Sequence, residues 1–200
     1  MSTNVSRPQI FRTYLHRGAG LNPTIVEALC ATMAHPSFFS PVKIGQPQRE
    51  RSFVSGPFGA NNPTRELLRE AGSVFGSEKR VAQVISIGAG KPRALPLESL
   101  TLTEVPAHLL KSTEVECEEV AAELSSRLFT LDAYVRLNTE SQEDVRSIDD
   151  WRGLEAIEKC TRAYLETHSI SHLLEMSLQS LKRRVGTATL DQISTRPLLF

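Results

Sequence analysis

The chain has 200 residues, of which 40% are hydrophobic and 23% are charged, as is usual for a globular domain with one core. Lys and Arg number 23 and Asp and Glu also number 23, so the formal net charge is zero. This balance removes the electrostatic argument for binding to nucleic acid and gives no support to a polybasic membrane anchor. The first residues, MSTNVSRPQIF, hold no apolar signal-peptide core, and no apolar run reaches bilayer length. These features predict a cytoplasmic protein.

The first elements expected along the chain are a short strand, a capped helix and a second strand. Residues 11–15 (FRTYL) are a strand candidate. Thr24 and Glu27 form a capping box, and the apolar pattern after it predicts a helix that ends before His35. The expected stripe of that helix is Ile25, Val26, Leu29, Thr32 and Met33. Residues 37–45 are expected to be a loop or short extended piece, and 52–55 a strand that stops in a glycine turn.

A second helix is expected after this turn, with Asn62 as its N-cap, Pro63 as its first residue and Gly76 as its stop. Its inner face is expected to hold Leu67, Leu68, Ala71, Val74 and Phe75. Residues 81–90 (VAQVISIGAG) are apolar and β-branched. This composition predicts a buried strand of a parallel sheet that is covered on both faces.

Residues 91–112 contain three prolines and predict a long loop of the kind that serves as a lid or binding segment. Thr113 and Glu116 form a second capping box, which predicts a helix over 113–129. Its buried face is expected to hold Cys117, Val120, Ala121, Leu124 and Leu128. Residues 133–138 (AYVRLN) alternate as a strand does.

Two more helices and a loose tail complete the expected elements. Asp149 or Asp150 caps the first helix, and the second runs from about Ser169 to a stop at Gly186. Their expected stripes are Trp151, Leu154, Ile157, Thr161 and Tyr164 in the first, and Leu173, Leu174, Leu178, Leu181 and Val185 in the second. The alternation of strands and helices along the chain predicts an α/β fold.

The cysteines and histidines predict neither a disulfide nor a metal site. Cys30, Cys117 and Cys160 are odd in number and far apart, so buried free thiols are expected. His168 and His172 have the i, i+4 spacing of a metal pair, but no third ligand is evident. We therefore expect them to be surface histidines.

The glycine and serine motifs predict no cofactor loop and no nucleophile. Gly88-Ala89-Gly90 follows a strand, but Arg93 stands where a dinucleotide-binding loop has its third glycine, so a tight strand exit is expected. A hydrolase of the Ser-His-Asp or Ser-Asp type presents its serine in a Gly-x-Ser-x-Gly turn. No serine of these 200 residues has that pattern, and residues 72–76 (GSVFG) place their serine one position too early.

Four stretches, in order, resemble the patatin-like phospholipase domain in the form common in large fungal multidomain proteins. They are FRTY (11–14), TIVEALCATMAHPSFFSPVKIG (24–45), FVSGPFGANNPTRELLREAGSVFG (53–76) and VISIGAG (84–90). The matching stretches of the family read like FRSY, WEAARATSAAPTFF, DGG-x-x-x-NNP and SIGTG. The family's later Tyr-x-Arg-x-Asn strand and Asp-Glu-Trp helix are similar to YVRLN (134–138) and DDWRGLEAIEKCTRAYLE (149–166).

The resemblance implies an α/β lipid acyl hydrolase that works with a Ser-Asp dyad and a glycine-rich oxyanion loop. It also implies that this chain begins after the half that carries the serine elbow and that loop. In the family the aspartate begins an Asp-Gly-Gly/Ala turn. Here Ser55 stands at the aspartate's position, Gly56 is kept and Pro57 replaces the next glycine. A neutral hydroxyl cannot take the nucleophile's proton near pH 7, and that general-base role is worth roughly 10²–10⁴-fold in rate.

The expected fold is therefore a partial patatin-like sheet with flanking helices, without the N-terminal strands and the elbow. Residues 1–9 are expected to be a flexible N-terminus, 10–185 the C-terminal part of the domain and 186–200 a tail. The function expected is that of a truncated, divergent lipid acyl hydrolase that is inactive as this chain. The alternatives are a non-enzymatic remnant that binds protein or lipid, and a separate chain that supplies the missing half. Expected partners are a lipid or acyl ester and a second copy, through the apolar edge of strand 81–87; no cofactor is expected.

Overall fold

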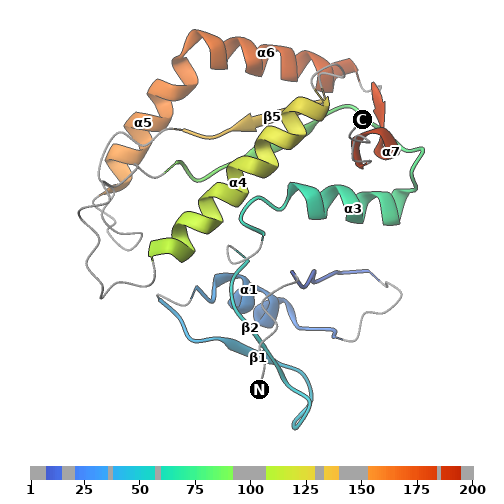
Figure 1. Ribbon diagram of the computed structural model, residues 1–200, viewed down its shortest axis with the longest axis vertical. Coiled ribbons are helices and arrows are strands. Elements are labelled where there is room, and N and C mark those ends of the chain that lie inside the picture. The colour runs from blue at the N-terminus through green and yellow to red at the C-terminus, as the bar shows by residue number, and fades with distance from the viewer. Residues whose placement is uncertain are drawn as a thin grey trace. The chain divides into compact units, whose positions relative to one another are not determined.

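The structure is a computed structural model of mixed α/β class (Figure 1). It divides into two compact units, one of residues 1–61 and 101–116 and one of residues 62–100 and 117–200. The side chains of residues 107–115 are not described. The described residues are 8–14, 21–35, 38–56, 60–91, 107–128, 133–139, 153–183 and 186–194.

The first unit contains one capped helix and one hairpin. Helix α1 (Ile25–Met33) starts from the predicted capping box, in which Thr24 Oγ1 accepts from the Glu27 amide and the Thr24 amide donates to Glu27 Oε2. Strand β1 (Val42–Ile44) pairs antiparallel with β2 (Arg51–Phe53). Gly45 after β1 has φ +132°, and a Cβ there would lie 3.0 Å from the Arg49 carbonyl oxygen, so the turn requires glycine.

The second unit contains two short sheets and the remaining helices (Figure 1). Strand β4 (Val84–Ile87) pairs parallel with β5 (Tyr134–Leu137), and β3 (Arg80–Val81) pairs antiparallel with β6 (Ala188–Thr189). The helices that lie wholly in this unit are α3 (Thr64–Phe75), α5 (Leu154–Glu166), α6 (His168–Arg183) and α7 (Leu190–Ser194). Helix α4 (Ala107–Leu128) belongs to both units.

The core of the second unit forms around α4. All five residues expected on its inner face, Cys117, Val120, Ala121, Leu124 and Leu128, are buried, which confirms the predicted stripe. Val120, Leu124 and Leu128 share a cluster with Leu68 of α3, Val84 of β4, and Leu190 and Ile193 of α7. The helix starts at Ala107, six residues before the expected Thr113, so the capping box at Thr113 and Glu116 lies inside the helix. The expected loop therefore ends at 106, and residues 92–106 lie outside the described ranges.

Residues 186–194 are not the loose tail that the sequence predicts. They form β6 and α7, and Leu190 and Ile193 of α7 are fully buried against α4. Gly186 lets this segment approach β3, because a Cβ there would lie 2.5 Å from the Val81 amide nitrogen. The expectation was wrong because two buried apolar residues in a five-residue helix are too few to give a periodic pattern.

Several predicted strands are shorter than expected or absent. Residues 11–14 form no strand, and Leu15 lies outside the described residues. The predicted strand 81–90 is split into β3 and β4 at Ala82 and Gln83. Only one face of β4 is covered, since Val84 and Ser86 are buried while Ile85 and Ile87 are exposed, so the expectation of two covered faces is wrong. Strand β5 forms as predicted.

Four predicted helical stripes are largely exposed instead of buried. On α1 only Ala31 is buried, and on α3 only Leu68 of the predicted apolar face is, although Gly76 ends α3 as expected. Thr161 and Tyr164 on α5 and Leu173 and Leu174 on α6 are partly buried. The exposed members of the four stripes are Ile25, Val26, Leu29 and Met33 on α1, Leu67, Val74 and Phe75 on α3, Leu154 and Ile157 on α5, and Leu178 and Leu181 on α6. The predicted caps Asp149 and Asp150, together with Trp151 and Val185, lie outside the described residues.

Candidate functional site

The Ser55 turn lies in the first unit, directly after β2. The Ser55 amide donates to the Ala34 carbonyl at 2.9 Å, and the Gly56 carbonyl accepts from the Ala60 amide at 2.8 Å. Ser55 is only 5% exposed, yet its Oγ has no hydrogen-bond partner in the part of the chain that the structure describes. Pro57 lies outside that part. The backbone of this turn is therefore held by hydrogen bonds. The Ser55 hydroxyl, by contrast, makes no hydrogen bond with any described residue.

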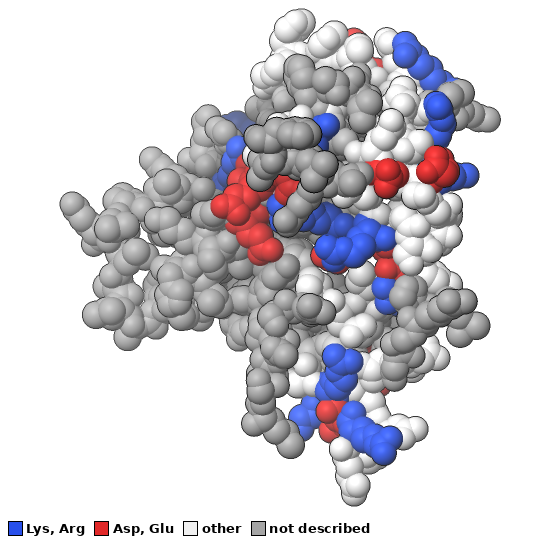
Figure 2. Space-filling model, turned by 45° about the vertical axis from the view of Figure 1, so that its right-hand side comes forward, with Lys and Arg blue, Asp and Glu red and all other residues white. Residues whose placement is uncertain are grey.

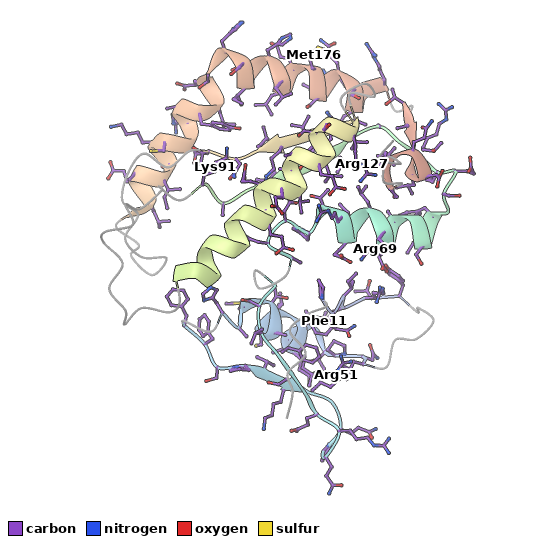
Figure 3. All side chains as sticks on the ribbon, viewed as in Figure 1. Phe11, Arg51, Arg69, Lys91, Arg127 and Met176 are labelled. Atoms are coloured by element: carbon purple, nitrogen blue, oxygen red, sulfur yellow. The ribbon has the colours of Figure 1, made fainter. Side chains whose placement is uncertain are left out.

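Strand β2, which precedes this turn, carries aromatic and basic side chains. The rings of Phe11 and Phe53 meet edge to face at 5.4 Å between centroids, and the Arg51 guanidinium lies 5.7 Å from the centre of the Phe53 ring (Figure 3). A serine becomes a nucleophile when a base accepts its proton, and Ser55 Oγ has no such acceptor among the described residues. This geometry gives no activated hydroxyl.

The Asn61-Asn62-Pro63 stretch after the turn crosses the boundary between the units, which falls between Asn61 and Asn62. Helix α3 begins at Thr64 and its N-cap is Pro63, so the expected cap at Asn62 is displaced by one residue. Asn62 still serves the helix start, because its Oδ1 accepts from the Thr64 amide at 3.3 Å and from Thr64 Oγ1 at 2.6 Å. It does so from a buried position.

Asn62 belongs to a buried polar network that joins three of the motifs quoted above to α4. Asn62 Nδ2 donates to the Cys117 carbonyl at 3.2 Å, and Thr64 Oγ1 lies 3.2 Å from Ser86 Oγ. Arg136 of β5 donates from Nη1 to Ser86 Oγ at 2.8 Å and from Nη2 to Cys117 Sγ at 3.0 Å. The NNP turn, the SIGAG strand and the YVRLN strand therefore meet at one point of the second unit.

The carboxyl ends of β4 and β5 are held together by Asn138. Its Oδ1 accepts from the Gly90 amide at 2.9 Å and its Nδ2 donates to Glu118 Oε1 of α4 at 3.1 Å. A Cβ on Gly88 would lie 2.2 Å from Asn138 Oδ1, and Gly90 has φ +104°. Both glycines are therefore needed to make room for Asn138 and to turn the chain, as expected for a tight strand exit.

Arg136 is the one cation of this network, and among the described residues it pairs with no carboxylate. Glu118 of α4, next to Cys117 in sequence, bonds instead to Asn138 and to Lys91 at 3.4 Å. Sequence reasoning missed the network. The available signals were a serine within the apolar strand and an arginine within the alternating pattern of β5.

A second polar cluster ties α4 to α3 and α7. Glu123 pairs with Arg65 and, at 2.9 Å, with Arg127, whose Nη2 also donates to the Ile193 carbonyl (Figure 3). Burial alone would raise the pKa of Glu123, but the hydrogen bonds and charges of Arg65 and Arg127 outweigh it and lower the pKa. Figure 2 shows basic and acidic groups side by side on the described surface of one face, in line with the zero net charge.

The described residues form no metal site. His168 and His172 are exposed at the start of α6, and within the described ranges no three His, Cys, Asp or Glu side chains gather around a metal-sized space. The three cysteines are free thiols, but only Cys117 is buried, and Cys30 is exposed, contrary to expectation. No described helix could cross a membrane, and the cytoplasmic location stays a prediction.

Comparison of the chain with protein-family models, with curated proteins and with solved structures found no match in any of the three. The patatin-like resemblance therefore rests only on the residues of the motifs and on their order along the chain. Two of their residues, Ser55 and Gly56, lie in the first unit, and three, Asn62, Ser86 and Arg136, converge in the second.

Proposed function

We propose that this chain is a divergent patatin-like segment. It keeps the turn that carries the dyad aspartate in the lipid acyl hydrolases of that family, but with Ser55 in place of the aspartate. The 200 residues then hydrolyse no acyl ester. The observation that carries the proposal is the state of Ser55: the residue at the position of the dyad aspartate is an uncharged hydroxyl, is 5% exposed and has no described hydrogen-bond partner.

The chemistry of ester hydrolysis makes this difference decisive. A Ser-Asp dyad needs a carboxylate that takes the nucleophile's proton, and a hydroxyl cannot hold that proton near pH 7. It also needs a serine presented on a strained turn, and none of the serines in these 200 residues lies in a Gly-x-Ser-x-Gly pattern. One member of a dyad has no catalytic use without the other.

The buried network supports the family part of the proposal. Polar groups inside a protein are costly unless they are hydrogen-bonded, and Ser86 bonds both to Asn62 and to Arg136 Nη1, which lie on elements far apart in sequence. Arg136 Nε is buried without a described partner. These residues come from the motifs that resemble the family. In our proposal they belong to the framework of a patatin-like domain.

The proposal is tested by measuring hydrolysis of p-nitrophenyl butyrate by the chain and by three variants. We expect rates equal to buffer for the chain, for Ser55→Ala and for Ser55→Asp. Ser55→Asn has the volume of aspartate without its charge, and circular dichroism of it shows whether the turn accepts that volume. Turnover above buffer that survives Ser55→Ala would mean that other residues are catalytic. New turnover in Ser55→Asp would reveal a nucleophile elsewhere in the chain.

The alternative is a non-enzymatic module that binds lipid or protein, and α1 is the observation that favours it. Ile25, Val26, Leu29 and Met33 lie on one side of this helix and are exposed, while Ala31 on the opposite side is buried. Flotation with phosphatidylcholine vesicles tests the lipid form of this alternative. The control is Glu155→Asp, an exposed substitution on α5. Vesicle binding that is lost in Leu29→Asp but kept in Glu155→Asp would favour a lipid-binding module over a chain that binds no ligand.

A further inference from the structure

Strand β4 has one edge that is paired and one that is not. The amides of Val84 and Gly88 donate to the carbonyls of Ala133 and Leu137, at 2.7 and 2.8 Å. In a parallel ladder alternate residues bond to the same neighbour, so Ile85 and Ile87 turn their N–H and C=O groups away from β5. Among the described residues no strand pairs with β4 on that side, which we name the outer edge (Figure 1).

Among the described residues, the outer edge of the four-residue strand β4 has no charge, proline or neighbouring strand that would hinder pairing between chains. Ile87 is 76% exposed and Ile85 is 42% exposed, although both are β-branched residues in a strand. Residues 81–89 contain no charge and no proline. Natural proteins usually protect such an edge with lysine, proline, a bulge or a covering segment. The outer edge therefore remains a template for another strand.

We propose that the outer edge of β4 pairs antiparallel with the outer edge of β4 in a second copy of the chain. A twofold axis beside Ser86 places Ile85 of one copy opposite Ile87 of the other. Directly opposite residues point to the same face of a sheet, so the pairing gathers four isoleucines on the exposed face. The strand order across the dimer is β5, β4, β4 and β5.

The edge fits a second copy better than an unrelated strand because it is complementary to itself. The two edges have the same length, and neither carries a charge that would repel the other. The twofold axis places each isoleucine of one copy opposite an isoleucine of the other. The opposite face of β4 holds Val84 and Ser86, which are already buried in their own unit, so the pairing leaves the core and the network unchanged.

Light scattering after size-exclusion chromatography, over a series of concentrations, tests this pairing in the full chain. We expect a dimer for the wild-type chain and dimerisation weakened roughly tenfold or more by Ile87→Lys, which puts two charges in the new sheet. The matched control is Ile25→Lys, because Ile25 is 77% exposed and lies on α1. We expect this control to dimerise as the wild type does. A monomeric wild type, or a dimer that Ile87→Lys leaves intact, would overturn the proposal.

A second variant separates backbone pairing from charge. Ile87→Pro adds no charge but removes the Ile87 side chain and an N–H that β5 does not use, and proline is tolerated at such edge positions. We expect it to weaken the dimer as Ile87→Lys does, with an unchanged far-ultraviolet circular dichroism spectrum. If Ile25→Lys dissociates the dimer and both Ile87 variants do not, the contact is made by α1 and the proposal fails. None of these outcomes depends on Ser55, so the proposed function is tested separately.

Discussion

Helices α1 and α4 carry apolar stripes of the same kind, but the stripe of α4 is buried and the stripe of α1 is exposed. On α4, Leu124 is 0% exposed and its neighbours on the stripe are buried with it. On α1, Leu29 is 57% exposed, and the buried residue is the small Ala31 on the other side. The difference shows that periodicity determines which side chains share a face. Whether that face is covered depends on other segments, and for α4 those include Leu190 and Ile193.

The largest expected effect comes from removing one leucine from each stripe. Leu124→Ala removes buried methyl groups and leaves a cavity, so we expect it to lower the free energy of unfolding by about 2–5 kcal/mol. Leu29→Ala truncates an exposed side chain and is expected to change it by no more than about 0.5 kcal/mol. Urea unfolding followed by circular dichroism measures both. Equal losses would mean that the α1 stripe is covered in solution, and the contrast between the helices would disappear.

The features that sequence alone predicts correctly are those fixed by near neighbours. The capping box of Thr24 and Glu27, the stop of α3 at Gly76 and the buried stripe of α4 each depend on residues within a few turns of one helix. The packing of residues 186–194 depends on α3 and α4, which lie far away along the chain. No local pattern could reveal it.

Ser55 and Ser86 are both buried and form the second comparison, because among the described residues Ser86 belongs to a hydrogen-bond network and Ser55 does not. Ser86→Ala removes the acceptor of Arg136 Nη1 and leaves a partly buried cation with one bond fewer, so we expect a loss of about 1–3 kcal/mol. Ser55→Ala removes a hydroxyl that has no described partner, and we expect a change of no more than about 0.5 kcal/mol. The same urea experiment compares them. A large loss for Ser55→Ala would show that its hydroxyl has a bonding partner in solution.

The candidate site was predictable in part, and the two serines show why. Ser55 and Gly56 were proposed through the resemblance, since a motif states which position the acid should occupy, and their role stays a prediction. Ser86 and Arg136 were not found, because a hydrogen bond between β4 and β5 depends on strand register. A serine or an arginine in a strand is usually only a solvent-facing residue, so the pattern did not distinguish them.

The smallest expected effect concerns pH and the Glu123 cluster. The pKa of Glu123 is lowered in the folded chain because the bonds and charges of Arg65 and Arg127 outweigh the opposing effect of burial. A lowered pKa stabilises the fold above the unfolded value of about 4.3, and that stability is lost as the pH falls through the folded pKa. At pH 7 we expect Glu123→Gln to cost less than about 1 kcal/mol, since the pair is only partly buried.

The gap between the wild-type chain and Glu123→Gln should therefore narrow as the pH is lowered from 7 to 3, because Glu123 loses its charge as the pH falls through its lowered folded pKa. Urea midpoints at several pH values measure the gap. The matched control is Glu158→Gln, which breaks the exposed ion pair with Arg162 at 2.7 Å on α5 and leaves the core contacts of α4 intact. We expect it to have a smaller effect at every pH, because screening by solvent weakens an exposed pair. A gap for Glu123→Gln that stays constant or widens in acid would mean that Arg65 and Arg127 stabilise α4 through packing rather than through the charge of Glu123.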